Sequence, residues 1–116
     1  MSGISTHVLD TSRGVAAAGV GVTLERLDSG ASGGWQLLAN AATDADGRVK
    51  VLLPPGVALA AGVYTIRFDT GSYFSRAGVK AFFPHVEVAF EITDATRHHH
   101  VPLLVSPFGY STYRGT

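Results

Sequence analysis

The sequence predicts an all-β protein, a sandwich of short strands, and three observations lead to this expectation. Apolar and polar residues alternate with a period of two in several segments, as in Val86–Ile92, whose large apolar side chains all fall on one face. Glycine is frequent, because 14 of the 116 residues, or about 12%, are glycine against an average of about 7%. These glycines separate the segments. No stretch has the length and pattern of a long helix. Each sheet should therefore have one apolar face.

Eight segments fit the strand pattern and are separated by turn residues. The expected strands are Ile4–Leu9, Val20–Glu25, Gly34–Ala42, Arg48–Leu53, Tyr64–Asp69, Val86–Ile92, His98–Val105 and Tyr110–Arg114. Turns are expected at Leu27–Gly34, Asp44–Gly47 and Pro54–Gly56. One short helix is expected over Ser72–Lys80, where two aromatic residues and an alanine form an apolar stripe.

Length and composition limit the possible functions. A chain of 116 residues with 46% hydrophobic residues is expected to form one domain, residues 1–116, and to bury about two-thirds of its unfolded surface. Nine Lys and Arg balance nine Asp and Glu, so neither a nucleic acid nor a membrane is an expected partner. There is no cysteine, which excludes disulfides, thiolate metal sites and a cysteine nucleophile.

The start of the sequence lacks the basic and apolar regions of a signal peptide, and no apolar run approaches about 20 residues. Tyr113–Thr116 is not a peroxisomal address of the Ser-Lys-Leu type. We therefore expect a cytoplasmic protein.

Five histidines are many for so short a chain, and four of them lie in its last third. In a strand, His98 and His100 would share one face, and His7 from another strand could complete a zinc site with an open position, while His99 would face away. The run lacks a standard metal spacing, so ordinary surface or core histidines compete with this interpretation. Acid–base catalysis is a third interpretation.

His7 is a candidate for acid–base chemistry because of its place in its strand. Alternation puts it on the face opposite to Ile4 and Val8, where it could line a groove or a subunit contact. An unperturbed pKa near about 6.5 would let it act as base or acid. A solvated histidine without a role remains the alternative.

Arg48 and the last ten residues are further candidates. Arg48 follows an Asp-Gly turn, two residues before Lys50, and such a residue is usually solvated. Its planar guanidinium could instead hold an anionic or carbonyl-rich substrate. The segment Pro107–Thr116 carries aromatic and hydroxyl side chains to its last residue, so we expect it to pack against the rest of the protein.

Four segments together resemble one known family, the 5-hydroxyisourate hydrolases, which are the transthyretin-related enzymes of urate breakdown. The segments are Ile4–Thr11, Thr43–Arg48, Ala81–Pro84 and His100–Gly115. The resemblance spans the chain and is weakest around Ser29–Gly33 and Pro54–Gly62.

This resemblance implies a transthyretin-like sandwich of two four-stranded antiparallel sheets, with a short helix between the fifth and sixth strands. It also implies a homotetramer, built as a dimer of dimers, in which outward sheet faces of paired subunits form a channel. The implied activity is hydrolysis of the small molecule 5-hydroxyisourate to 2-oxo-4-hydroxy-4-carboxy-5-ureidoimidazoline. A positioned base and an oxyanion partner can drive such a hydrolysis, so we expect neither a cofactor nor a metal. A transthyretin-like carrier without catalysis is the alternative.

The resemblance also assigns site residues. The implied catalytic set falls on His7, Arg48 and His100, with water activated by a histidine and assisted by the arginine. The implied substrate-binding residues are His98, Tyr113, Arg114 and Thr116. The family ends in Tyr-Arg-Gly-Ser, whereas this chain has Thr116 in the last position, which keeps the hydroxyl and adds a methyl group.

Overall fold

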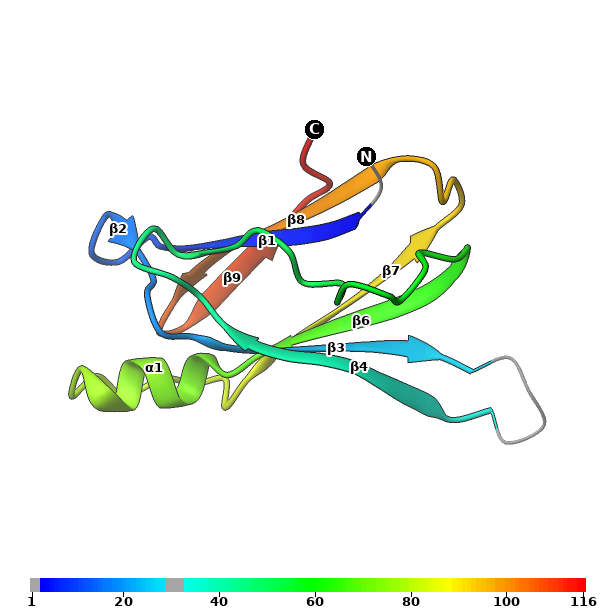
Figure 1. The fold of residues 1–116 in the computed structure, drawn as a ribbon. Helices are drawn as coiled ribbons and strands as arrows, with labels where there is room; N and C mark the ends of the chain where they lie inside the picture. Colours follow the sequence, from blue (N-terminus) through cyan, green and yellow to red (C-terminus); the bar gives the residue numbers. More distant parts are fainter. Residues whose placement is uncertain (1–2, 29–32) are drawn as a thin grey trace.

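A computed structural model describes residues 3–28 and 33–116, which form two β-sheets packed face to face (Figure 1). One sheet has the strand order β2-β1-β8-β9, with β5 also paired to β1, and the other has the order β4-β3-β6-β7. The elements are β1 (Gly3–Asp10), β2 (Val15–Ala16), β3 (Gly21–Leu27), β4 (Trp35–Ala42), β5 (Arg48–Val49), β6 (Gly62–Phe68), α1 (Thr70–Arg76), β7 (Val86–Ile92), β8 (His98–Ser106) and β9 (Gly109–Thr112). Part of the turn expected at Leu27–Gly34, residues 29–32, lies outside the described residues.

The predicted fold class is confirmed, and two details of it are corrected. The first sheet has five strands instead of four, because the short β2 pairs with the end of β1. The pair β1 and β8 is parallel, whereas all pairs were expected to be antiparallel. Most of the chain, including the whole second sheet, separates these two strands, which provides the long connection that a parallel pair requires.

The strand expected at Arg48–Leu53 is also corrected. Only Arg48 and Val49 pair with β1, and the chain then leaves the sheet. Leu52 and Leu53 are both buried while Val51 is 70% exposed. Two consecutive inward side chains cannot occur in a regular strand, because successive residues there point to opposite faces.

The helix α1 begins and ends earlier than the predicted Ser72–Lys80. Asp69 caps its N-terminus by accepting a hydrogen bond from the backbone N–H of Ser72. Gly78, with a φ of +72°, follows its C-terminal turn, a left-handed conformation that glycine adopts without strain. Tyr73 and Phe74 are buried as the apolar stripe predicts, whereas Ala77 is exposed.

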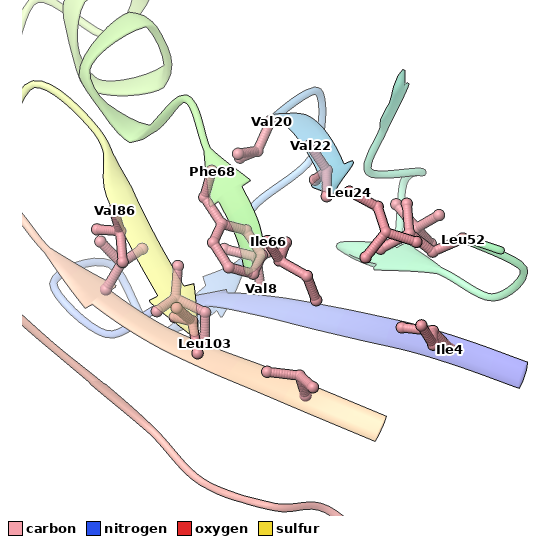
Figure 2. Close-up of a cluster of buried hydrophobic side chains, with 14 of the residues drawn as sticks. Ile4, Val8, Val20, Val22, Leu24, Leu52, Ile66, Phe68, Val86 and Leu103 are labelled. Carbon is pink, nitrogen blue, oxygen red and sulfur yellow. The ribbon is translucent and has the colours of Figure 1, made fainter. Parts of the chain in front are cut away.

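The core lies between the two sheets and receives apolar side chains from both (Figure 2). In β7, Val86, Val88 and Ile92 are buried while the intervening glutamates are exposed, which confirms the predicted alternation.

Among residues 3–28 and 33–116, no helix is long and apolar enough to cross a membrane.

Candidate active site

Strand register brings the expected catalytic residues to one face of the sheet. His7 on β1 lies directly opposite Arg48 on β5, and Ser5 on β1 lies opposite His100 on β8. Side chains at paired positions project to the same face, as do residues two apart in one strand. His98, two residues before His100, therefore joins this group, whose members lie on β5, β1 and β8.

A short loop places Arg48 next to β1. The carboxylate of Asp44 accepts hydrogen bonds from the backbone N–H groups of Asp46 (2.9 Å) and Arg48 (3.0 Å). The hydrogen bond from the Arg48 N–H, followed by that from Asp46, lowers the pKa of Asp44 despite an opposing effect of burial. Gly47 completes the turn with a φ of +75°, and a Cβ there would lie 2.4 Å from the carbonyl oxygen of Val8. Only glycine fits this position, which explains the Asp-Gly sequence before Arg48.

The same loop determines the protonation pattern of His7. Its Nε2 lies 2.9 Å from the backbone carbonyl oxygen of Asp46. A carbonyl can only accept a hydrogen bond, so Nε2 carries the proton and the neutral ring has its lone pair on Nδ1.

The histidine run on β8 is divided between the two faces of the sheet. His99 points inward and is 7% exposed, and burial lowers its pKa. On the outward face, the Ser5 hydroxyl lies 2.7 Å from Nε2 of His98 and 2.8 Å from Nδ1 of His100. Strand alternation puts Ser5 on the same face as His7, but Ser5 is not among the site residues predicted from the sequence.

His100 is kept neutral by its surroundings. Burial lowers its pKa first, and the neighbouring charges of Arg48, His7 and His98 lower it further. A neutral imidazole can accept a proton near pH 7.

The zinc interpretation gains no support, because no three His, Asp or Glu side chains among residues 3–28 and 33–116 are grouped as metal ligands.

The C-terminal segment packs against His100. The backbone N–H of Gly115 donates a hydrogen bond to the carbonyl oxygen of His100 (2.8 Å). A Cβ on Gly115 would lie 2.6 Å from Cδ2 of the His100 ring, so the absence of a side chain permits this approach. The segment is thus ordered against the sheet, as the sequence led us to expect.

Thr116 then borders an open pocket of about 320 Å³ that is also lined by Arg48, Lys50, His98 and His100. The lining contains two basic side chains and no acidic one, which suits an anionic or carbonyl-rich molecule. The predicted binding residues Tyr113 and Arg114 are not brought to this pocket. They line a second pocket of about 300 Å³, together with His99, His100 and residues of β7, so His100 borders both pockets.

The family model described as HIUase/Transthyretin family matches residues 4–115. The chain belongs to this family.

Similar members of the HIUase/Transthyretin family include 5-hydroxyisourate hydrolases and transthyretins. The chain is 44% identical to the 5-hydroxyisourate hydrolase of Mus musculus, over 99% of this chain and 96% of that protein. Among solved structures, Klebsiella pneumoniae 5-hydroxyisourate hydrolase matches with a TM-score of 0.83 and 41% identity, over 99% of this chain and 100% of that one. Sea bream transthyretin in complex with thyroxine matches with a TM-score of 0.88 and 32% identity, over 97% of this chain and 94% of that one. Backbone similarity alone does not distinguish a hydrolase from a transthyretin, because both match closely. The residues of the site have to distinguish them.

Proposed function

We infer that this protein hydrolyses 5-hydroxyisourate. The observation that carries this inference is the convergence of His7, Arg48 and His100 on one sheet face beside a cationic pocket. A carrier needs a pocket of suitable shape but no set of proton-transferring groups. The identities of 41–49% to proteins named 5-hydroxyisourate hydrolase support the same activity.

In the proposed reaction, water attacks a ring carbonyl next to nitrogen. The carbonyl C–N bond then breaks, which leaves a carboxylate on the carbon and an N–H on the departing nitrogen. His100 takes a proton from the attacking water, because its environment favours the neutral imidazole. Arg48, with its exposed guanidinium beside His100, stabilises the negative charge that develops on the carbonyl oxygen.

The remaining site residues position substrate and water. His7 presents Nδ1 as its free ring nitrogen, which accepts a hydrogen bond from the attacking water and orients it. The proton that His100 removes from the water then passes to the departing nitrogen. His98 and Thr116 line the pocket and supply hydrogen bonds to the ring. Tyr113 and Arg114 line the second pocket beside β7, so we assign them to a binding surface completed by a neighbouring subunit.

We propose a homotetramer, a dimer of dimers, as the active form. β7 and β9 each end the strand order of their sheet, and residues of β7 and of the segment beginning at Thr112 line one pocket. Free edges of this kind readily pair with another chain. Phe82 and Phe108, 72% and 73% exposed, add apolar surface that a partner would cover. Light scattering would give four times the 12.1 kDa chain mass, and a fully active monomer would contradict the proposal.

We also propose the cytoplasm as the site of the reaction. A chain without cysteine gains nothing from an oxidising compartment. Fractionation of the native cell, followed by immunodetection, tests this placement.

The activity is tested with 5-hydroxyisourate prepared by oxidising urate immediately before use. Loss of its ultraviolet absorbance is followed with and without the protein, since the compound also decays spontaneously. A rate proportional to protein concentration supports hydrolysis. Binding without acceleration would instead favour a transthyretin-like carrier.

A further inference from the structure

Ser5 occupies a central position among the polar side chains of the site. It lies on β1 opposite His100 and is only 9% exposed. Its hydroxyl contacts one ring nitrogen of His98 and one of His100, and these are its only hydrogen-bond partners among the described residues. Both contacts join positions more than 90 residues apart in the chain.

Counting protons restricts what this arrangement can be. A serine hydroxyl has one hydrogen to donate and two lone pairs to accept with. If both ring nitrogens were bare, only one of them could receive the hydrogen, and the other would face a lone pair at 2.7 or 2.8 Å. If both carried hydrogens, the two lone pairs of Ser5 could accept them, but its own hydrogen would have no acceptor on either ring and would have to turn to the open pocket that Ser5 lines. Only one donating and one accepting nitrogen use the hydrogen and the lone pairs of Ser5 within the group itself.

The charge of Arg48 decides between the two directions. Because Nδ1 of His100 is engaged by Ser5, Nε2 is the ring nitrogen left to interact with the neighbouring guanidinium, whose charge already disfavours protonation of His100. A cation favours a lone pair over an N–H hydrogen at that nitrogen. The hydrogen of neutral His100 therefore lies on Nδ1.

We propose that Ser5 is a positioning residue that fixes His100 as the Nδ1–H tautomer. Its hydroxyl accepts the Nδ1–H of His100 and donates its own hydrogen to Nε2 of His98. Nε2 of His100 is then left as the one basic nitrogen of that ring. This role rests on the hydrolysis proposed above, and it explains why a small hydroxyl residue lies between two histidines.

The network also supports the charged state that His100 reaches during the reaction. When Nε2 takes a proton from water, the ring becomes an imidazolium, and its Nδ1–H bond to Ser5 becomes charge-assisted and stronger. No further proton has to move. The charged groups around His100 are Arg48, His7 and His98, with Lys50 across the pocket, and all of them are cationic or become so on protonation. The backbone of Ser5 acts in the opposite direction and favours the protonated ring. Ser5 is thus the neutral acceptor among groups that oppose this charge.

The matched variants for the test are Ser5→Thr and Ser5→Val. Threonine and valine have nearly the same shape, and only threonine keeps the hydroxyl, so both variants carry the same packing change. We expect Ser5→Val to lower kcat about 10²-fold, with KM changed less than about threefold, and Ser5→Thr to remain within about fivefold of wild type. The acidic limb of the pH–rate profile is expected to move to lower pH in Ser5→Val alone, because the imidazolium loses its acceptor. Ser75→Ala, a serine replacement on α1 remote from the site, is the control with unchanged kinetics.

A second measurement does not depend on activity or on any Ser5 variant. Nitrogen-15 NMR of histidine-labelled wild-type protein distinguishes the two neutral tautomers, with the His100 signals identified by their loss in His100→Asn. The Nδ1–H form of His100 is the expected result, and the Nε2–H form would overturn the proposal. Equal kcat values for Ser5→Val and wild type would overturn it as well. An inactive wild-type protein whose His100 is the Nδ1–H tautomer would refute the hydrolase function and leave the tautomer assignment intact.

Discussion

Replacing Gly115 with alanine would test how closely the C-terminal segment controls His100. The added Cβ would lie 2.6 Å from Cδ2 of the imidazole and 3.2 Å from its Cβ and Cγ, whereas ordinary contacts begin near 3.4 Å. The ring or the segment must therefore move by roughly 0.8 Å, and a displacement of about 1 Å at a catalytic group can cost about 10²-fold in rate. Movement of the ring also strains its 2.8 Å contact with Ser5.

We therefore expect Gly115→Ala to lower kcat about 10²-fold, while the melting temperature changes by less than about 3 °C because the core is untouched. Initial rates on freshly prepared 5-hydroxyisourate and calorimetry measure the two quantities. Gly34→Ala is the control, because no heavy atom lies within 4 Å of the position its Cβ would take, and Gly34 precedes β4 in the other sheet. A Gly115→Ala enzyme with kcat within twofold of wild type would refute the steric argument.

Four further outcomes are expected. Replacing His7, Arg48 or His100 singly with alanine lowers kcat by about 10² or more with little loss of stability, because none belongs to the apolar core; kinetics and thermal melts check this. Since the pKa of His100 is lowered and the base must be neutral, the rate persists below the ordinary histidine pKa of about 6.5 and falls only at lower pH, as a pH–rate profile would show. Tyr73→Phe removes the 2.8 Å hydrogen bond to buried Asp10 and costs about 1–3 kcal/mol in denaturant unfolding at pH 7. Prolonged dialysis against a chelator leaves the rate unchanged, and recovery of a lost rate on adding zinc would contradict that expectation.

Asp10 also gives the stability a defined pH dependence. Burial raises its pKa, but hydrogen bonds from Ser12, Tyr73 and the backbone of Arg13 outweigh that effect, and the net shift is downward. A lowered folded-state pKa means that the stabilisation is present above the unfolded value of about 3.9 and is lost as pH falls through the folded value. Tyr73→Phe should therefore reduce this acid-side slope of the unfolding free energy.

Much of the site was predictable because strand alternation is a local property. The spacing of His98, His99 and His100 alone indicates that the outer two share a face and the middle one faces away, as the structure shows. The Asp-Gly turn before Arg48 also marks a fixed position. Ser5 could have been found by the same rule, because it shares the face of His7, but alternation says nothing about what a side chain contacts.

The sequence by itself determined the strand segments, the apolar and polar faces, and the family resemblance, since each depends on residues that are neighbours in the chain. Only the tertiary structure decided that β1 pairs in parallel with β8, that Ser5 bridges His98 and His100, and that Gly115 packs on the His100 ring. The hydrogen bond between Ser5 and His100 spans 95 positions, and no local pattern encodes a partner at that separation. The choice of strand neighbour depends on how the whole chain buries its apolar faces between two sheets, so the geometry of the site becomes defined only when that core has formed.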